Sequence, residues 1–391
     1  MIGLIIGKND QVSSLTYDLL LKIFGLDIRN IIVLISTDSI TFISSKNLQD
    51  KLKRSLRHLD LNPFLTDFHI LSEDINLKHL SKKQLFLFPD NQSSEHSRHL
   101  FQLMDKCNFV REPMPHLVYE YLITKSTDEV DKTKMAATLL CYLFSELRHL
   151  ITSDESSLIG DDLKAKCEDM LLQEKENLDE IDFPESPKME SNSNMKELAE
   201  SPDGTFVIIS LSLAYKMQPA SITRTLFMNP SESQSENYKF LLDLQHWAMS
   251  KIAVGLKLST FFKLVKDQVK SGRPLLEKSL KPSLGFILTM SFSNRSYEIC
   301  QATSKHCFIN NCMVYLSLGF THPDFTASLS DTIFIDHEAV PTIITEAANK
   351  SPSFVQFINC EDSFSSDHSP VESPQSLHKG ISSFFCSRIL L

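Results

Sequence analysis

The sequence predicts an α/β lobe at the N-terminus followed by an α+β domain. Up to residue 119, short apolar runs typical of strands alternate with helical patterns. Beyond residue 200, two strand-like runs precede two helical patterns, and three further strand-like runs follow. Alternating elements favour an α/β sheet, whereas segregated elements favour α+β. Length agrees with two units, because a chain of 391 residues exceeds the size at which one hydrophobic core stops growing.

The first lobe is expected to span residues 1–119. Its predicted strands are GLIIG, NIIVLIS, ITFIS, HILS and LFLF, and its predicted helices include SLTYDLLLKIFGL and SEHSRHLFQLMDKC. The segment KNLQDKLKRSLRHLD carries a basic face made by Lys51, Lys53, Arg54 and Arg57. Such a face is either a phosphate-contacting patch or a solvated surface, and the solvated surface is the simpler interpretation.

The second domain is expected to span residues 120–345. An amphipathic helix over 127–150 presents Met135, Leu139, Leu140, Leu143 and Leu147 on its apolar side. TFVIISLSLAY and SITRTLFM are expected to pair as strands, two helices are expected over 232–254 and 259–270, and GFILTMSF, CMVYLSLGF and DTIFI are expected as strands. This order predicts helices laid on one face of a curved antiparallel sheet.

The negative charge of the chain is concentrated in one segment. The net charge is −10, and residues 151–200 hold fifteen acidic residues against five lysines, which accounts for all of it. We treat residues 151–203 as an acidic insert within the second domain, with a solvated helix followed by an extended or disordered stretch. Such an insert repels nucleic acid and attracts basic proteins, or it is a solvated loop with no partner. Residues 346–391 are expected to form a flexible tail.

The sequence contains no run of eighteen apolar residues, and no basic residue precedes the apolar start MIGLIIG. We therefore expect neither a membrane span nor a signal peptide, and an intracellular protein. The eight cysteines include no CxxC pair. His306, Cys307 and Cys312 are conceivable metal ligands, but structural zinc sites usually present closely paired ligands, so buried thiols are the simpler interpretation.

Several phrases of the chain resemble a known family. SITRTLFMNPSESQSENYKFLLDLQ, SLGFILTMSF and VYLSLGF occur in an order and at distances similar to those of the creatinase and aminopeptidase P, or pita-bread, fold. Within that superfamily these phrases, together with GLIIGKND and DKTKMAATLLCYLFSEL, resemble the N-terminal domain of the large subunits of FACT histone chaperones. The resemblance runs to about Glu361 and implies a pita-bread fold for residues 120–345. It also implies a shortened form, because that family continues into middle and acidic C-terminal regions.

The resemblance further indicates where an active relative would bind metal. Active pita-bread peptidases hold two divalent metals through two Asp, one His and two Glu. These ligands fall on Ser210, Ser221, Phe286, Ser317 and Ser330 of this chain. Neutral hydroxyls offer none of the negative charge that two divalent ions require, and a phenyl ring offers no lone pair. We expect no metal, no cofactor and no catalytic residue there.

A serine hydrolase at the same positions is the other enzymatic interpretation. A serine nucleophile needs an adjacent base held by a third group, and these motifs contain no histidine. The resemblance instead implies a non-catalytic chromatin factor located on chromosomes in the nucleus. Its implied partners are core histones and the small HMG-box subunit of FACT, with replication or transcription proteins also possible, and neither sequence-specific DNA binding nor membrane association is expected. The alternative is a peptide-binding pseudopeptidase detached from chromatin.

Overall fold

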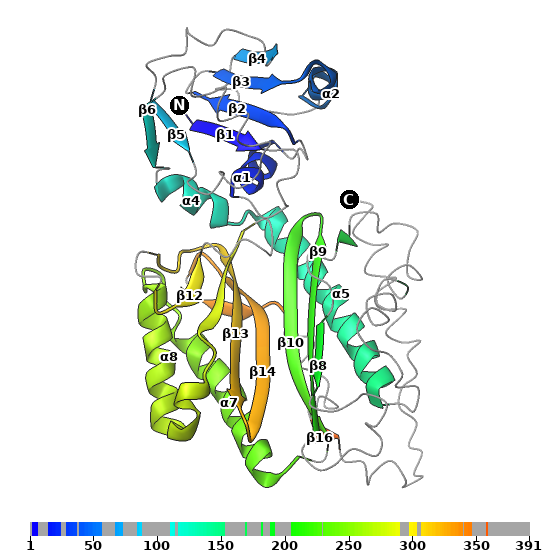
Figure 1. Ribbon diagram of the computed structural model, residues 1–391, viewed down its shortest axis with the longest axis vertical. Coiled ribbons are helices and arrows are strands. Elements are labelled where there is room, and N and C mark those ends of the chain that lie inside the picture. The colour runs from blue at the N-terminus through cyan, green and yellow to red at the C-terminus, as the bar shows by residue number, and fades with distance from the viewer. Residues whose placement is uncertain are drawn as a thin grey trace.

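Two β-sheets organise the chain, one in each lobe (Figure 1). The computed structural model describes residues 2–6, 15–24, 29–36, 39–56, 67–72, 84–87, 110–113, 116–152, 169, 181–182, 188–191, 205–228, 230–289, 297–302, 306–338, 340–345 and 357–358. Within these ranges, no helix is both long enough and apolar enough to cross a membrane.

The first lobe is a six-stranded sheet with the strand order β4-β3-β2-β1-β5-β6. Strand β2 pairs antiparallel with β1 and β3, whereas β4, β5 and β6 join in parallel. Nearly every residue of β1, β2 and β3 is buried, which agrees with the apolar sequences of β1 and β2, while β3 also buries Thr41 and Ser44. The elements are β1 Ile2–Ile6, α1 Leu15–Phe24, β2 Ile31–Ile35, β3 Ser39–Ser44, α2 Lys46–Leu56, β4 Asp67–Ser72, β5 Gln84–Leu87 and β6 Val110–Pro113.

This arrangement confirms an α/β lobe. On α2, Lys51 and Lys53 are exposed and Leu52 between them is buried, as the basic-face pattern requires. The helix predicted over residues 94–107 lies outside the described residues.

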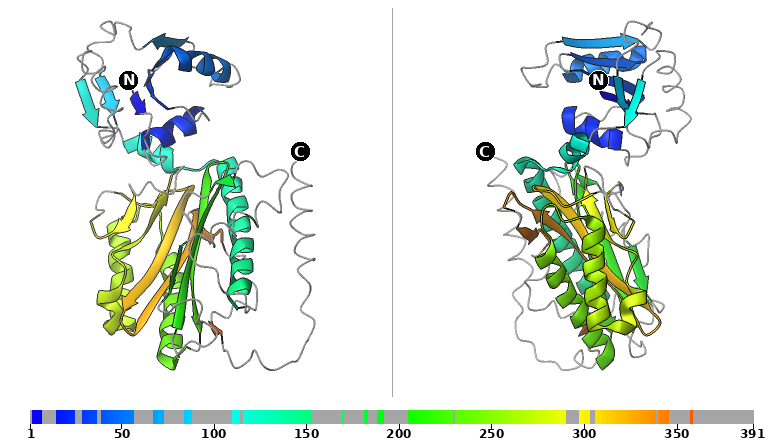
Figure 2. Two further views of the ribbon diagram at one scale, coloured as in Figure 1. Left: turned by 45° about the vertical axis from the view of Figure 1, so that its right-hand side comes forward. Right: turned by 90° about the vertical axis from the view of Figure 1, so that its left-hand side faces the viewer.

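Two helices connect the lobes. Helix α4 spans His116–Ile123 and α5 spans Thr127–Thr152. Leu122 belongs to the apolar core of the first lobe, whereas Ile123 belongs to a core of the second domain, so the chain passes from one core to the other at these neighbours. In both views of Figure 2 the first lobe lies above the second domain, and the chain between them runs through these helices.

The second domain is built on a ten-stranded, mostly antiparallel sheet whose main path is β12-β11-β13-β14-β10-β9-β7. The predicted pairing of TFVIISLSLAY with the next strand is confirmed, since β9 and β10 form a continuous antiparallel hairpin. The main elements are β9 Thr205–Tyr215, β10 Gln218–Met228, α7 Glu232–Lys251, α8 Leu258–Gly272, η3 Pro274–Ser279, β11 Ser283–Leu288, β12 Glu298–Cys300, β13 Cys312–His322 and β14 Phe325–Ile335.

Strands β10 and β14 meet at one pair, Thr223 opposite Ser330. Short strands complete the pairing on either side of this crossing. Strand β15, Pro341–Ile343, pairs with the end of β14, and β16, Phe357–Ile358, pairs with the end of β10. Two further short strands, β7 Ile181–Asp182 and β8 Lys188–Ser191, pair with β9. Parts of the acidic insert and of the expected tail are therefore strands, while most of both lies outside the described residues.

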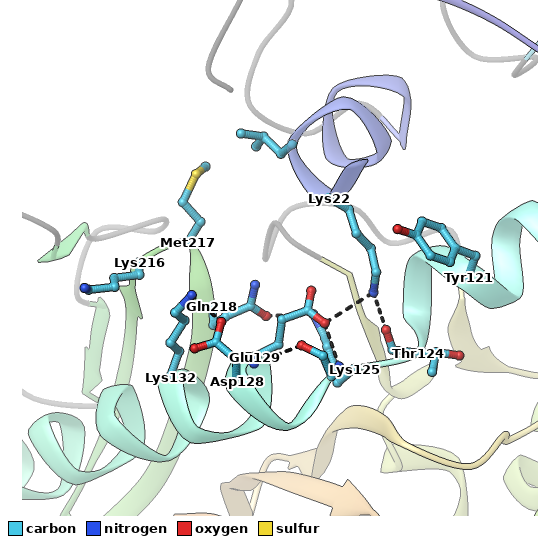
Figure 3. Close-up of a pocket in the computed structure, with 12 residues that line it drawn as sticks. Lys22, Tyr121, Thr124, Lys125, Asp128, Glu129, Lys132, Lys216, Met217 and Gln218 are labelled. Atoms are coloured by element: carbon cyan, nitrogen blue, oxygen red, sulfur yellow. Dashed lines mark hydrogen bonds and ion pairs between the residues drawn. The ribbon is translucent and has the colours of Figure 1, made fainter. Parts of the chain in front are cut away.

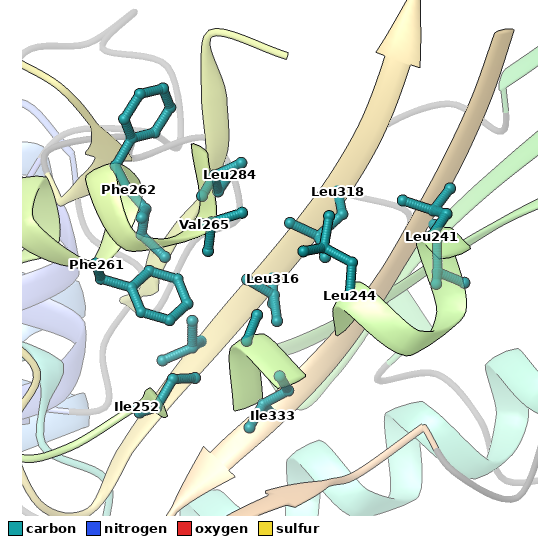
Figure 4. Close-up of a cluster of buried hydrophobic side chains, with 14 of the residues drawn as sticks. Leu241, Leu244, Ile252, Phe261, Phe262, Val265, Leu284, Leu316, Leu318 and Ile333 are labelled. Carbon is teal, nitrogen blue, oxygen red and sulfur yellow. The ribbon is translucent and has the colours of Figure 1, made fainter. Parts of the chain in front are cut away.

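The strand register separates the second sheet into two faces. On one face, side chains of β9 and β10 such as Ile209 and Ile222 pack with Leu140 of α5. On the same face, side chains of β13 and β14 pack with those of α7 and α8, including Leu316, Leu318 and Ile333 against Leu241, Leu244, Phe261 and Val265 (Figure 4). We call this the helix face. The prediction of helices on one side of the sheet is confirmed.

Candidate functional site

The five positions singled out in the sequence lie together on the face opposite the helix face, which we call the serine face. Thr223 of β10 stands opposite Ser210 of β9 and opposite Ser330 of β14, and Ser330 stands opposite Ser317 of β13. A row of hydroxyls thus crosses four strands. Ser221 lies two residues from Thr223 on β10, and Phe286 of β11 stands opposite Tyr315, two residues from Ser317. Because side chains alternate between faces, all of them share one face.

The hydroxyls of this row are engaged mainly with each other and with the backbone. Ser210 and Thr223 lie 3.0 Å apart through their hydroxyls, and the Tyr315 hydroxyl lies 3.4 Å from that of Thr223. Ser212 donates to the Ser221 hydroxyl at 3.0 Å, and Ser221 in turn donates to a backbone carbonyl at 3.0 Å. These bonds tie neighbouring strands together, and none of them joins a hydroxyl to a base that could activate it.

Burial also limits what this row can do. Ser221, Ser317 and Ser330 are 2%, 8% and 0% exposed. The hydroxyl oxygen of Ser330 is buried without a protein partner among the described residues. Nucleophilic attack requires a substrate to reach the oxygen, so the buried serines are suited to strand packing rather than to catalysis.

Phe286 fills its position with apolar contacts. It is 6% exposed and belongs to a cluster that includes Val130 of α5, Leu288 and Met313. Its ring centroid lies 5.2 Å from that of Tyr315. A side chain in such surroundings gains from burial and loses if it carries an unpaired polar group.

The glycine before Phe286 has a separate geometric cause. Gly285 has a φ of +109°, a region that side chains rarely adopt. A Cβ at this position would lie 1.8 Å from the backbone oxygen of Tyr315 on the neighbouring strand. Only glycine allows the two strands to approach so closely.

Two divalent metal ions do not fit the residues at these five positions. The row offers neutral hydroxyls and one phenyl ring, whereas hard cations require carboxylate or carbonyl oxygens and charge compensation. Asp331 is adjacent to Ser330, but the alternation of the strand directs it to the helix face. Within the described ranges, no group of three or more His, Cys, Asp or Glu side chains is placed to hold a metal.

Asp331 serves instead in a buried ionic network. Its Oδ1 accepts a hydrogen bond from Arg224 Nη2 at 2.8 Å, and its Oδ2 accepts one from Gln245 of α7 at 2.8 Å. Arg224 also donates to the backbone oxygen of Ser330 at 2.7 Å, and both charged side chains are at most 1% exposed. The network joins β10, β14 and α7 at the crossing of the two halves of the sheet, so we assign it a structural role.

Of the cysteine cluster considered in the sequence, Cys312 is buried, whereas His306 and Cys307 are half-buried. Cys312 is fully buried in the core beneath α7 and α8, and burial raises the pKa of its thiol to about 12. The His306 ring packs on Tyr297 with centroids 4.5 Å apart. The burial of Cys312 in this apolar core agrees with the interpretation of a buried thiol.

A pocket that the sequence did not predict lies at the junction of the lobes. Its volume is about 780 Å³ (Figure 3). Its walls come from α1, the end of α4, the start of α5 and the turn between β9 and β10. The lining residues are Leu21, Lys22, Tyr121, Thr124, Lys125, Ser126, Asp128, Glu129, Lys132, Lys216, Met217 and Gln218.

Hydrogen bonds and an ion pair connect the elements that line this pocket at the junction of the lobes. Lys22 of α1 donates to the backbone oxygen of Thr124 and lies 3.5 Å from Oε2 of Glu129. Lys125 is 4% exposed and donates to Gln218 Oε1 at 2.9 Å and to the backbone oxygen of Thr289 at 2.7 Å. Burial lowers the pKa of Lys125 to about 8. No sequence signal identified these lysines, because they come from separate segments.

Comparison with known proteins identifies a family that the chain matches. Residues 133–337 match the model of Metallopeptidase family M24, which covers more than half of the chain. Among curated proteins, the chain is 24% identical over 269 residues to the FACT complex subunit SPT16 of Debaryomyces hansenii, an alignment that covers 59% of this chain and 26% of that protein. The chain therefore spans about a quarter of the length of this relative.

Solved structures agree on the fold. The N-terminal domain of FACT complex subunit SPT16 from Cicer arietinum superposes with a TM-score of 0.72 at 17% identity, covering 88% of this chain and 90% of that domain. The X-Pro aminopeptidase of Thermotoga maritima superposes with a TM-score of 0.65 at 14% identity, covering 92% of this chain and 97% of the enzyme. The resemblance to the FACT large subunit and the pita-bread fold expected from the sequence are both confirmed.

Proposed function

The chain belongs to metallopeptidase family M24, and we propose that it is a member without peptidase activity that acts as a chromatin factor of the FACT large-subunit type. In this role it binds histones or partner proteins while nucleosomes are reorganised in transcription, replication and repair. The expected partners are core histones and the small HMG-box subunit of FACT. The expected location is the nucleus, on chromosomes.

The observation that carries the proposal is the serine face. On the alignment that the resemblance implies, hydroxyls and a phenyl ring occupy the five positions where a dinuclear peptidase would need carboxylates and an imidazole, and the strand register brings these positions onto one face. A change at one position would leave a weakened enzyme, but a change at all five removes the charge that holds the metals. Retention of the fold without its chemistry supports a binding role. The similarity to SPT16 supports the proposal that this chain acts on chromatin.

Charge supports the choice of basic partners. The chain carries a net charge of −10, and residues 151–200 account for it. Histones are strongly basic, so a concentrated acidic segment favours association with them and disfavours nucleic acid. Direct reading of a DNA sequence is not part of the proposal.

Binding of the purified full chain to each of the two core-histone heterodimers, measured by analytical ultracentrifugation at several salt concentrations, tests the histone role. We expect complexes that weaken as salt rises and that weaken further when the acidic residues of 151–200 are replaced by Asn and Gln. A control carrying Asp243→Asn and Asp267→Asn, both exposed on the helices of the second domain, should bind as wild type. No complex with either heterodimer, even at low salt, would contradict the role and favour the alternative of a peptide-binding pseudopeptidase detached from chromatin.

Peptidase activity is tested separately. The purified chain is incubated with Mn²⁺ or Co²⁺ and Xaa-Pro dipeptides, beside an active M24 peptidase as a positive control. We expect hydrolysis no faster than in buffer with metal alone. Metal-dependent turnover that is lost on chelation would refute the non-catalytic assignment.

A further inference from the structure

We propose that the outer side of α8, together with the adjoining η3, binds the phosphate backbone of double-stranded DNA without reading its sequence. The inference goes beyond the histone role, because it concerns a separate surface and a ligand of the opposite charge. It rests on the concentration of positive charge in one segment, on the spacing and exposure of its lysines, and on its separation from the described part of the acidic insert.

Positive charge is concentrated in residues 251–281, which run from the last residue of α7 through α8 and η3. Seven lysines and one arginine stand there against Asp267 and Glu277, which gives the segment a net charge of +6 in a chain whose net charge is −10. A segment with this balance creates a positive potential that attracts polyanions, even where the protein as a whole is acidic.

Three of these lysines line one side of α8. Lys263, Lys266 and Lys270 are spaced by three and four residues, so they are neighbours along the helix surface. Phe261 and Val265 belong to the face that packs on the sheet (Figure 4). At 1.5 Å of rise per residue, the three lysines span about 10 Å. One strand of DNA places a phosphate about every 3.4 Å along the duplex axis, so this length of helix passes about three phosphates.

Lys278 of η3 extends the row. Lys266 and Lys278 line the same pocket between α8, η3 and β12, and Lys266 lies 3.9 Å from Oε1 of Glu277, the residue before Lys278. The start of η3 therefore lies against the side of α8 that carries the lysines. We call Lys263, Lys266, Lys270 and Lys278 the basic surface.

The ammonium groups of the basic surface are available to a ligand. Lys263, Lys270 and Lys278 are exposed, and none of the three side chains makes a hydrogen bond or an ion pair within the described ranges. Lys266 is half-buried, and its only ion pair there is the long one to Glu277. Asp267 is exposed on α8 as well, so it reduces the positive potential of the surface without cancelling it.

Sheet topology keeps the basic surface apart from the described strands of the acidic insert. Helix α8 packs beside β12, at one end of the main sheet path, whereas β7 and β8 pair with β9. Five strand spacings separate β12 from β9. At about 4.8 Å each, they amount to about 24 Å along the sheet, which exceeds the Debye length of about 8 Å at physiological salt. In Figure 1, α8 lies on the left of the second domain, and β8 and α5 lie on the right.

The basic surface suits a phosphate backbone better than an acidic peptide. A peptide docked on a protein surface is held chiefly by apolar anchors in pockets. The exposed apolar residues of this region, Leu264 and Leu275, are single side chains on different elements, and scattered residues of this kind are ordinary on a protein surface. Lysines act on phosphates as point charges, and contacts to phosphates carry no sequence information directly. The surface therefore favours duplex DNA of any sequence.

The test uses the full chain and a fluorescein-labelled duplex of about 20 base pairs, followed by fluorescence anisotropy at about 50 to 200 mM NaCl. With four phosphate contacts, the logarithm of the binding constant should fall against that of the salt concentration with a slope of about −3.6, a loss of about 150-fold over this range. A duplex of the same length and a different sequence should bind within twofold.

Two triple variants locate the site. Lys263→Gln, Lys270→Gln and Lys278→Gln together should weaken binding at least tenfold at the lowest salt and reduce the slope to about −1. The matched control is Lys46→Gln, Lys51→Gln and Lys53→Gln on α2, because these lysines are also exposed and their loss changes the net charge equally. The control should bind within twofold of wild type. Circular dichroism and thermal unfolding verify that each variant is folded.

Three results would overturn the proposal. One is no binding of the duplex at a protein concentration of about 0.1 mM at the lowest salt, which is the weak limit of ordinary non-specific binding. Another is an equal or larger loss of affinity in the α2 variant, which would indicate general attraction or a site on the first lobe. The third is tighter binding of a polyglutamate peptide than of the duplex, with loss of affinity in the α8 variant, because the basic surface would then be a site for acidic proteins.

Discussion

Replacing Phe286 by histidine tests whether the position that the resemblance aligns with a metal-ligating histidine is part of the core. Phe286 is 6% exposed and packs with Val130, Met313 and Tyr315. Full burial of a phenylalanine side chain is worth about 1.5–3 kcal/mol, of which an imidazole would keep only a part. A buried imidazole without a hydrogen-bond partner adds a further cost, so we expect Phe286→His to lower the free energy of unfolding by about 1 to 3 kcal/mol.

The assay is urea unfolding followed through the fluorescence of Trp247, the only tryptophan of the chain, which packs partly against the core under α7. Phe286→Leu is the matched control, because it stays apolar and should cost less than the histidine. The new imidazole is held neutral by burial, so its pKa in the folded state is depressed. The unfolded state then binds more protons, and the deficit of the histidine variant should grow as pH falls below about 6.5.

Metal is the second part of the same experiment. Since the remaining positions offer only hydroxyls, Mn²⁺ or Co²⁺ should not raise the midpoint of unfolding of Phe286→His. Equal stability of wild type and the histidine variant would show that Phe286 is not packed as described. A metal-dependent stabilisation of the variant would show that the other positions can still hold a cation, and would refute the reasoning about the whole row.

Three further predictions concern buried groups. Arg224→Met should lower the free energy of unfolding by about 3–5 kcal/mol, because it leaves Asp331 buried without its partner. Adding Asp331→Asn should recover part of that loss in a double-mutant cycle, and additive losses would contradict a direct pair. Burial lowers the pKa of Lys125 in the folded state to about 8. Above that pH the unfolded state keeps a proton that the folded state has lost, so the free energy of unfolding rises with pH. Relative to Lys125→Met, wild type should therefore gain about 2 kcal/mol of stability between pH 7 and pH 9.5. A stability difference that does not change with pH would exclude a buried, charged Lys125. Gly285→Ala should lower the free energy of unfolding by more than about 3 kcal/mol, because the new Cβ would lie 1.8 Å from the backbone oxygen of Tyr315. The loss would be measured as a decrease in soluble protein or as the disappearance of the thermal transition. An unchanged thermal transition would disprove the tight strand contact.

Part of the second domain could be predicted from the sequence because serines and leucines alternate in its strands. In TFVIISLSLAY, Ser210 and Ser212 lie on the face opposite Leu211 and Leu213, and the hairpin places the next strand in register. The resemblance then located Ser210, Ser221, Ser317 and Ser330, and the register brings them onto one face with Phe286. What the alternation could not reveal is that most of these side chains are buried, since burial depends on what covers the sheet.

The lobe junction could not be predicted, for a different physical reason. Lys22, Lys125 and Lys216 are unremarkable in sequence, because lysines are normally solvated and nothing local distinguishes a buried one. They meet only when α1 is placed against the start of α5 and the β9–β10 turn. Likewise, the ion pair of Arg224 with Asp331 joins residues 107 positions apart. Contacts of this kind are set by the packing of whole elements and leave no periodic pattern.

The acidic insert shows the same limit on a smaller scale. The composition of the insert predicts a solvated, partly disordered segment. Two short strands within it, β7 and β8, nevertheless pair with β9 of the main sheet. Strand pairing at an edge needs only backbone groups, so it can recruit residues that have no strand propensity of their own.

The most direct test of the central claim is recovery of the tagged full chain from nuclear extract, with mass spectrometry of its partners and metal analysis of the same sample. We predict enrichment of core histones or of the small HMG-box subunit of FACT over a tag-only control, and less than one-tenth of a divalent transition-metal ion per chain. Two bound ions per chain would contradict the non-catalytic assignment. Absence of both partners would contradict the chromatin role.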